Sequence, residues 1–180
     1  MKHFFIINPA SGPVDSSTKL IEKIEAIFKN KDEEYEIYVT KMAKDSFRIA
    51  SERSANLTEE TIFYACGGDG TSFDVINGIA GKPNAYFAVV PAGSCNDFLK
   101  SFPNVDFSNL ENVINSDAYP IDVLQINDKI CVNVCNIGYD AKTNADCMRF
   151  RKKMKSIHKA YIKALAINLL KPLGDQVLIE

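Results

Sequence analysis

Three glycines and an aspartate, Gly67-Gly68-Asp69-Gly70, stand directly before Thr71 and after an apolar stretch. Glycines let several backbone N–H groups approach one anion, and the positive end of a helix that we expect to begin at Thr71 points to the same place. Phosphate is the natural anion for such a loop. Asp69 by itself would repel phosphate, so it indicates a divalent cation that bridges the two. The motif therefore predicts a site for a magnesium nucleotide.

Two better-known glycine motifs are absent from the sequence. The dinucleotide pattern GxGxxG would need glycine where Phe73 stands. The pattern GxxxxGK[ST] does not occur. The loop is therefore neither a dinucleotide fingerprint nor a Walker A motif.

Two more polar loops follow apolar stretches. The first runs from Asn8 to Gly12 and the second from Pro91 to Phe98. Because ligands bind at the carboxyl ends of the strands in an open parallel sheet, we expect all three loops to form one site. The two added loops offer hydroxyl, amide and carboxylate groups from Asn8, Ser11, Ser94, Asn96 and Asp97.

Apolar stretches alternate with amphipathic ones over the first part of the chain. The patterns predict strands at 2–7, 34–40, 61–66 and 85–90, and helices at 16–30, around 47–50, at 71–79 and at 108–115. Strands that are apolar throughout and separated by helices predict a parallel sheet covered on both faces. We therefore expect residues 1–118 to form an α/β nucleotide-binding domain of three layers.

The pattern changes after residue 118. Residues 119–126 and 129–137 read as strands that flank the turn Asn127-Asp128, which predicts an antiparallel hairpin. Two helices broken near Lys155 are expected over 142–171, and residues 175–180 resemble the start of a strand. A lone strand cannot bury a face, so we expect residues 119–180 to open a second domain whose remainder is missing. A frayed tail is the alternative for the last segment.

Composition limits the class of protein. The chain has 180 residues, of which 46% are hydrophobic and 24% charged, with no apolar run near the ~20 residues of a membrane-spanning helix. Five cysteines without CxxC spacing, two histidines and no secretory signal predict a cytoplasmic protein with buried, reduced thiols and without a zinc site. The cysteines are Cys66, Cys95, Cys131, Cys135 and Cys147.

Charge is divided unevenly along the chain. Residues 1–141 carry 12 basic and 20 acidic side chains, whereas residues 142–180 carry 9 and 3. The bases between Arg149 and Lys163 alternate with apolar residues, which is typical of an amphipathic helix at an anionic membrane surface. A solvated helix face is the alternative.

The segments NPASG, GGDGT with Asn77-Gly78, and PAGSCNDF occur in this order and resemble the diacylglycerol kinase catalytic domain of soluble bacterial lipid kinases, sphingosine kinases and ceramide kinases. The resemblance covers essentially the whole chain and continues through residues 121–123 and 133–141. GGDGT alone is shared with NAD kinases and phosphofructokinases. The PAGSCNDF segment favours the lipid branch.

This resemblance implies an ATP-dependent kinase that uses Mg²⁺ to transfer the γ-phosphate to a lipid hydroxyl, in a cleft between an NAD kinase-like α/β domain and a β-sandwich domain. It assigns nucleotide binding to Asn8, Pro9, Ser11, Gly12, Thr40, Gly67, Gly68, Asp69, Gly70, Thr71, Ser94, Asn96 and Asp97. Asp69 would also support catalysis and hold magnesium indirectly. The family's catalytic base lies in the second domain, so we expect the 180-residue chain alone to be inactive.

The sequence departs from the family pattern at Phe73, Asp74 and Cys95, where the family commonly has asparagine, glutamate and a small or polar residue. An NAD kinase-like enzyme and a non-catalytic module that senses nucleotide or lipid are the alternative functions. The expected partners are a nucleotide and a lipid substrate at the membrane surface, without nucleic acid. Self-association stays open.

Overall fold

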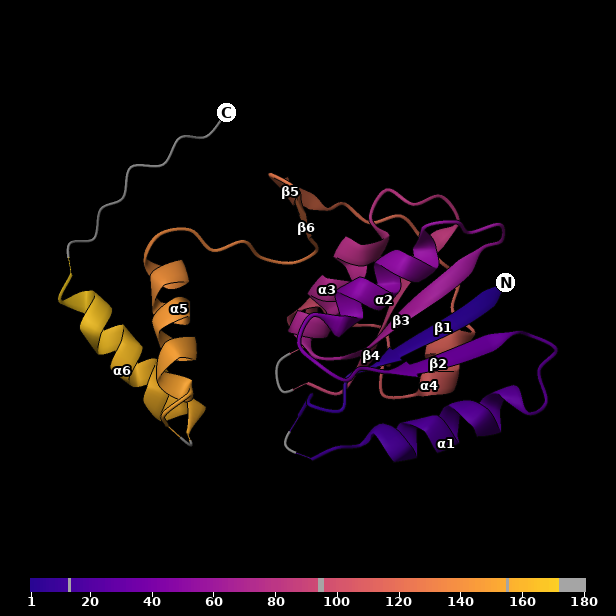
Figure 1. The fold of residues 1–180 in the computed structure, drawn as a ribbon, viewed down its shortest axis with the longest axis horizontal. Coiled ribbons are helices and arrows are strands. Elements are labelled where there is room, and N and C mark those ends of the chain that lie inside the picture. The colour runs from indigo at the N-terminus through magenta and orange to yellow at the C-terminus, as the bar shows by residue number, and fades with distance from the viewer. Residues whose placement is uncertain (13, 94–95, 155, 172–180) are drawn as a thin grey trace. The chain divides into compact units, whose positions relative to one another are not determined.

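Four parallel strands form the centre of the first unit of the protein (Figure 1). The computed structural model describes residues 1–12, 14–93, 96–154 and 156–171. The strands are β1 (Lys2–Ile7), β2 (Tyr35–Val39), β3 (Thr61–Gly67) and β4 (Ala85–Pro91). Their order is β2-β1-β3-β4 and every neighbouring pair is parallel, which confirms the predicted α/β sheet.

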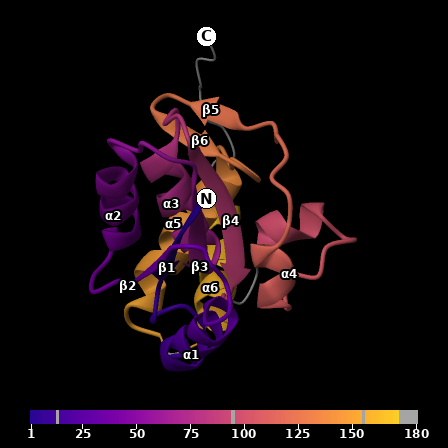
Figure 2. The same cartoon turned by 90° about the vertical axis from the view of Figure 1, so that its right-hand side faces the viewer.

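Helices cover both faces of this sheet and make three layers (Figure 2). The helices are α1 (Ser17–Phe28), α2 (Asp45–Ser54), α3 (Asp69–Ile79) and α4 (Leu110–Ile114). One face packs against α1 and α4, and the other packs against α2 and α3. The predicted three-layer arrangement is therefore confirmed.

Strand β1 shows why the strands are apolar throughout. Phe5 contributes to the core under α1 and α4, where its ring stacks on Tyr64 with 4.3 Å between centroids. Phe4 contributes to the core under α2 and α3 and meets Phe63 edge to face at 5.6 Å. Successive side chains point to opposite faces, so burial of both faces requires apolar residues at every position.

A histidine is buried at the start of β1. His3 is 2% exposed, and its Nδ1 lies 2.9 Å from the Tyr64 hydroxyl. Burial lowers the pKa of His3, and the carboxylate of Glu33, 3.8 Å from Nε2, opposes this shift with a smaller effect. The neutral imidazole is therefore the form that the folded protein favours.

The predicted hairpin is present but shorter than expected. Strands β5 (Leu124–Ile126) and β6 (Lys129–Cys131) have three residues each and pair across the turn at Asn127, whose φ is +53°. All three residues of β5 are exposed, so within the described part of the chain no second layer covers this strand of the hairpin. An uncovered two-stranded ribbon is marginally stable, which explains the short pairing.

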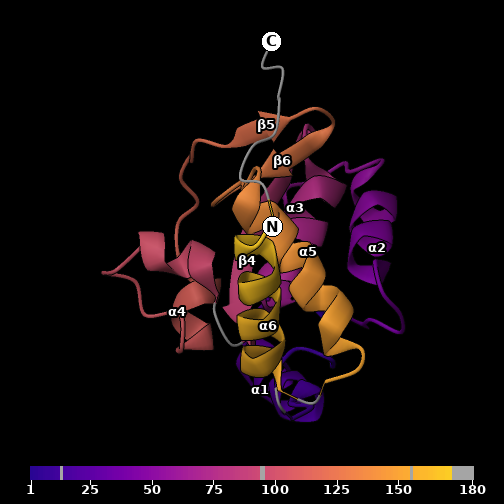
Figure 3. The same ribbon diagram turned by 90° about the vertical axis from the view of Figure 1, so that its left-hand side faces the viewer.

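Residues 134–180 form a second compact unit, and residues 1–133 form the first. In the second unit α5 (Tyr139–Arg151) and α6 (Ile157–Leu169) pack through Cys147, Ala160 and Ala164 (Figure 3). The expected pair of helices with a break near residue 155 is therefore confirmed, although α5 begins earlier than expected. The domain division after residue 118 stays a prediction, and the expected strand at 175–180 lies outside the described residues.

Two of the four described cysteines, Cys66 and Cys147, are buried, and burial raises the pKa of the Cys66 thiol. Cys131 is half-buried and Cys135 is exposed, so the expectation of buried thiols is wrong for Cys135. None of the helices in the described residues is long and apolar enough to cross a bilayer.

Candidate functional site

The strand order opens a crevice at the carboxyl edge of the sheet. From β1 the chain moves to one side to form β2 and then returns to the other side to form β3. Loops that leave two such strands diverge, and ligands of open α/β sheets bind at this point. The loop after β1 begins at Asn8, and the loop after β3 begins at Gly68. The two loops singled out from the sequence therefore flank the same crevice.

Asn8 joins the two sides of the crevice. Its Nδ2 donates to Thr71 Oγ1 at 3.0 Å, and its Oδ1 accepts a hydrogen bond from Ala10 N at 3.0 Å. Its backbone N–H donates to the Cys66 carbonyl at 2.9 Å. Thr71 is 3% exposed, so this link holds the first loop on the buried start of α3.

Helix α3 starts at Asp69, two residues earlier than expected. Gly68 is its N-cap, with extended backbone and without a capping side chain. The first amides of a helix have no acceptor within the helix. A Cβ built on Gly70 meets no atom within 4 Å, so open space lies beside this first turn. The helix therefore directs the amides of its first turn and its positive end to a space that can hold an anion.

In residues 67–70, which we call the phosphate loop, Gly67 and Gly68 are needed for space and not for an unusual backbone angle. Among the described glycines only Gly12, Gly81 and Gly138 have positive φ, so residues 67–70 take backbone angles that other residue types also adopt. A Cβ on Gly93 would lie 2.5 Å from the Gly68 Cα atom, closer than real atoms come. The backbone of the third loop thus packs directly on the phosphate loop.

A hydrogen bond brings the aspartates of two loops together. Asp69 Oδ1 accepts from the backbone N–H of Asp97 at 2.6 Å. Asp97 begins the 3₁₀ helix η1 (Asp97–Ser101), which the sequence did not predict, and its carboxylate pairs with Lys100. The carboxylate of Asp69 therefore fixes the third loop through Oδ1, and its second oxygen bonds to none of the described residues.

Asn96 is strained and incompletely paired. Its φ is +49°, and its Nδ2 donates to the Gly93 carbonyl at 2.9 Å. Its Oδ1 is buried and accepts no hydrogen bond from any described residue. A buried acceptor without a donor costs free energy, so the atom favours a ligand that supplies one.

The other predicted residues lie along the same edge with fewer contacts. The Thr40 N–H donates to the Ile7 carbonyl at 2.9 Å, which sets this buried threonine beside the end of β1. The Ser11 N–H donates to the Asn8 carbonyl at 3.1 Å. A Cβ on Gly12 would lie 2.6 Å from the Ala92 carbonyl oxygen, so the first and third loops touch.

Pro9 lies half-buried in the first loop, whereas Ser94 and Cys95 lie outside the described residues. Of the two described departures from the family pattern, Phe73 is 42% exposed, and burial raises the pKa of Asp74. Neither side chain forms a hydrogen bond within the site among the described residues.

Asn77 positions the β5–β6 hairpin, a role that the sequence did not predict. The side chain of Asn77 on α3 accepts from Ile130 N at 2.8 Å and donates to the Ile130 carbonyl at 2.9 Å. The amide thus pairs with the backbone of β6 as a neighbouring strand would and holds the hairpin on α3. The sequence singles out Asn77 only in the Asn77-Gly78 pair that follows GGDGT, and that pair does not predict this role.

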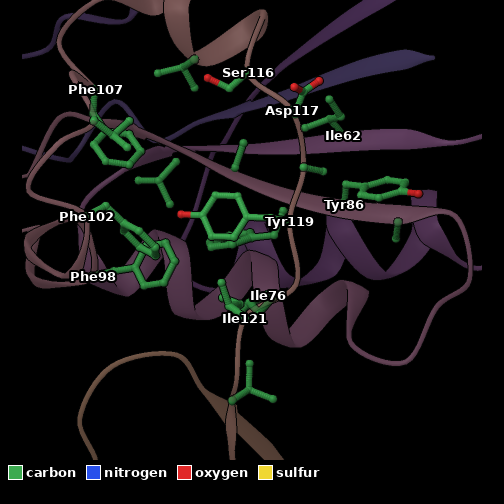
Figure 4. A pocket seen from close by; sticks show the side chains of 18 residues that line it. Ile62, Ile76, Tyr86, Phe98, Phe102, Phe107, Ser116, Asp117, Tyr119 and Ile121 are labelled. Carbon is green, nitrogen blue, oxygen red and sulfur yellow. The ribbon is translucent and has the colours of Figure 1, made fainter.

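A cavity of about 320 Å³ lies at the free edge of β4 (Figure 4). Its lining is largely apolar and includes six aromatic residues among 18, and of these Phe98 and Phe102 belong to η1 or follow it directly. The ring of Phe102 lies 5.1 Å from that of Phe98 and 6.0 Å from that of Tyr119. This lining suits an apolar group and not a phosphate, so the cavity is separate from the anion site.

Comparison with known proteins agrees with this geometry. Residues 2–126 match the family model for the diacylglycerol kinase catalytic domain. A diacylglycerol kinase of Bacillus subtilis (strain 168) is 31% identical over 164 residues, which cover 89% of this chain and 53% of that protein. A probable YegS-like lipid kinase of Shewanella frigidimarina is 28% identical over 117 residues, 62% of this chain and 37% of the relative.

A crystal structure of a diacylglycerol kinase from Bacillus anthracis str. Sterne superposes with a TM-score of 0.55 and 27% identity, over 72% of this chain and 45% of the other. The chain spans about half the length of the curated diacylglycerol kinases that it matches. The parallel sheet, the loops at its carboxyl edge and the family match lead to one conclusion: this chain belongs to the diacylglycerol kinase catalytic domain family.

Proposed function

We propose that this chain is the nucleotide-binding part of an ATP-dependent lipid kinase, which transfers the γ-phosphate of ATP to a lipid hydroxyl. The observation that carries the proposal is the open N-terminus of α3 at the crevice between β1 and β3. The ties of Asn8 to Thr71 and of Asp97 to Asp69 hold the three loops around it. Transfer of a phosphoryl group depends mainly on such positioning and on neutralisation of charge.

The phosphates would bind at the amides of Gly70 and Thr71. These amides lie in the first helical turn, where backbone donors and the helix dipole both stabilise negative charge. Asn96 Oδ1, the buried acceptor without a partner among the described residues, would take a hydrogen bond from a hydroxyl or amino group of the nucleotide.

Asp69 fits an indirect role toward magnesium. No cluster of three metal-ligating side chains is present in the described ranges, so these residues form no complete cage for a cation. Mg²⁺ usually keeps several waters and is held by one or two carboxylates together with the phosphates. The oxygen of Asp69 that Asp97 leaves free suits this arrangement. Bound magnesium would neutralise part of the charge on the phosphates.

The lipid substrate and the place of reaction belong to the same proposal. The relatives named diacylglycerol kinase support a lipid hydroxyl as acceptor, at a membrane surface where such lipids reside. The chain covers about half of these relatives, and we place no catalytic base within it. We therefore expect MgATP binding by the 180-residue chain but no phosphorylation of lipid.

The family match favours this function over an NAD kinase-like enzyme. A non-catalytic nucleotide or lipid sensor would share the fold and differ in activity. The deciding experiment is calorimetric titration of the folded chain with MgATP, with NAD⁺ and metal-free ATP as controls. Magnesium-dependent binding of ATP in preference to NAD⁺ supports the proposal, whereas a folded chain that binds no nucleotide contradicts it.

A further inference from the structure

The cavity at the free edge of β4 has the size and composition of a small-molecule site. Its lining residues lie between Ile62 and Val123, all within the first unit. Its volume of about 320 Å³ lies near the lower end of the range typical of such sites, about 300–1,000 Å³. Sites of this kind are mostly apolar with a few polar groups, as this lining is. Neither the phosphates nor the magnesium of the proposed function would use it.

The cavity reaches around the edge of β4. Ala88 packs on the core under α1 and α4, whereas Phe87 packs on the core under α2 and α3, and both line the cavity. Val113 is a buried part of the lining, but Val105 is 42% exposed and Tyr119 is 60% exposed. The cavity therefore has a buried side and a side open to solvent, and a ligand would cover the open apolar side chains.

Five of the aromatic rings in the lining form a connected group. Phe102 meets Phe98 edge to face at 5.1 Å, Tyr119 at 6.0 Å and Phe107 at 6.2 Å, and Phe98 lies 5.8 Å from Phe87. The face of an aromatic ring carries negative potential and the edge carries positive potential. Groups of rings in different orientations bind ammonium groups as well as apolar chains.

The segment that supplies more than half of the lining is acidic. Residues 102–128 carry five acidic and no basic side chains. Asp117 is the charged residue among the 18 that line the cavity, and its carboxylate pairs with none of the described residues. Ser116 beside it already donates to the Asn112 carbonyl at 2.6 Å (Figure 4). The electrostatic potential of this segment therefore repels anions and attracts cations.

We propose that this cavity binds an amphiphilic amine, a ligand with an aliphatic chain and a protonated amino group at one end. The chain would cover the apolar lining, and the ammonium group would meet Asp117 and the ring of Tyr119. A fatty acid or a phosphate ester has the wrong charge. A basic peptide has the right charge but needs a larger surface than this cavity offers. The binding needs no nucleotide, so the inference goes beyond the proposed function and does not depend on it.

The two parts of the interaction have sizes that can be measured separately. Each methylene group that leaves water should raise the affinity about fourfold. Asp117 is exposed, so its attraction for an ammonium group should add about two- to fivefold. The exposed ring of Tyr119 should add about two- to fivefold through the cation–π interaction. The chain therefore provides most of the affinity, and the end group decides which amphiphile is preferred.

The test is calorimetric titration of the full 180-residue chain at pH 7 with octylammonium, 1-octanol and octanoate, which differ in the end group. We expect octylammonium to bind most tightly, octanoate most weakly, and butylammonium far more weakly than octylammonium. Asp117→Asn should lower the affinity for octylammonium about two- to fivefold and leave that for octanol unchanged. The matched control Glu111→Gln removes the same charge from α4, outside the lining, and should bind like wild type.

The position of the ligand can be checked by fluorescence, because the chain contains no tryptophan. Tyr119→Trp places one reporter in the lining and keeps an aromatic face, so octylammonium should shift its emission to shorter wavelength. Tyr35→Trp places the reporter on β2, at the other edge of the sheet, and should not respond. Tyr119→Leu keeps an apolar side chain without the ring, so it should weaken octylammonium about two- to fivefold and leave octanol unchanged.

Absence of octylammonium binding, equal affinity for octylammonium and octanoate, or an equal response of both tryptophan reporters would overturn the proposal. So would an equal loss in Asp117→Asn and Glu111→Gln. Tighter binding of a lysine-containing apolar peptide than of octylammonium would assign the surface to a protein partner instead. Circular dichroism checks that each variant is folded. Calorimetry with MgATP on the same proteins separates the two proposals, since failure of nucleotide binding leaves the amine result standing and the reverse also holds.

Discussion

Gly70 allows the anion site to be tested separately from the fold. It lies in the first turn of α3, it does not have a positive φ, and a Cβ on it meets no atom within 4 Å. Alanine loses less conformational entropy than glycine on entering a helix, so Gly70→Ala should stabilise the folded state by about 0.5–1 kcal/mol. For a chain of this size the melting temperature should rise by about 1–4 °C.

The affinity for MgATP should fall in Gly70→Ala, although the folded state becomes more stable. The added methyl group would occupy the space from which a phosphate reaches the amides of the first turn. Gly70→Asp adds a negative charge there, and at about 5 Å with an effective dielectric constant of about 20 its repulsion costs about 3 kcal/mol, or two orders of magnitude in affinity. A carboxylate in the first turn favours the helix, so this variant should still fold.

The assay pairs scanning calorimetry with MgATP titration of wild type and both variants. Lys82→Gln, which changes the net charge as Gly70→Asp does but lies beyond the other end of α3, is the control and should bind normally. Wild-type affinity in both Gly70 variants would refute the placement of the phosphates at this helix. A clearly lower melting temperature for Gly70→Ala would refute the open space.

Three further outcomes are expected. Asp69→Asn keeps an acceptor for the Asp97 N–H but loses the charge, so calorimetry should show less dependence of ATP binding on magnesium; unchanged dependence would contradict the role of Asp69. Asn77→Ala leaves both backbone groups of Ile130 unpaired, so the hairpin should lose about 1–3 kcal/mol of protection in amide hydrogen exchange, and full protection would mean that the hairpin holds itself. The lowered pKa of His3 makes the unfolded state bind the proton more readily, so the free energy of unfolding should rise with pH up to about 6.5. Urea titrations on either side of that pH should show the rise in wild type and a smaller one in His3→Gln.

The sheet could be predicted because its signal is local and repeated. Every position of β1 after Lys2 is buried, which makes the strand a continuous run of mostly apolar residues. Helix α1 was equally clear, since its apolar positions recur at helical spacing. The helix buries one apolar stripe and the strand buries both faces. Each requirement fixes the spacing of apolar residues along the sequence.

The bounds of the helix and the strands near the site could be determined only from the tertiary structure. Helix α3 begins at Asp69. The carboxylate of this residue accepts a hydrogen bond from the N–H of Asp97, which lies 28 positions further along the chain. The hairpin pairs over only three residues on each side, because pairing of a ribbon depends on what covers its faces. The pattern of residues within one segment does not predict contacts with segments that are distant in the sequence.

The sequence by itself thus determined the layers of the fold, the three loops and the residue types that could meet a phosphate. Only the tertiary structure shows that Gly68 must be small to admit the backbone of Gly93. It also shows that Gly70 faces open space. Only the tertiary structure decided the role of Asn77, because its amide holds the hairpin only when β6 lies beside α3. Side-chain periodicity encodes burial along one element, whereas close approach between elements is a property of the folded chain.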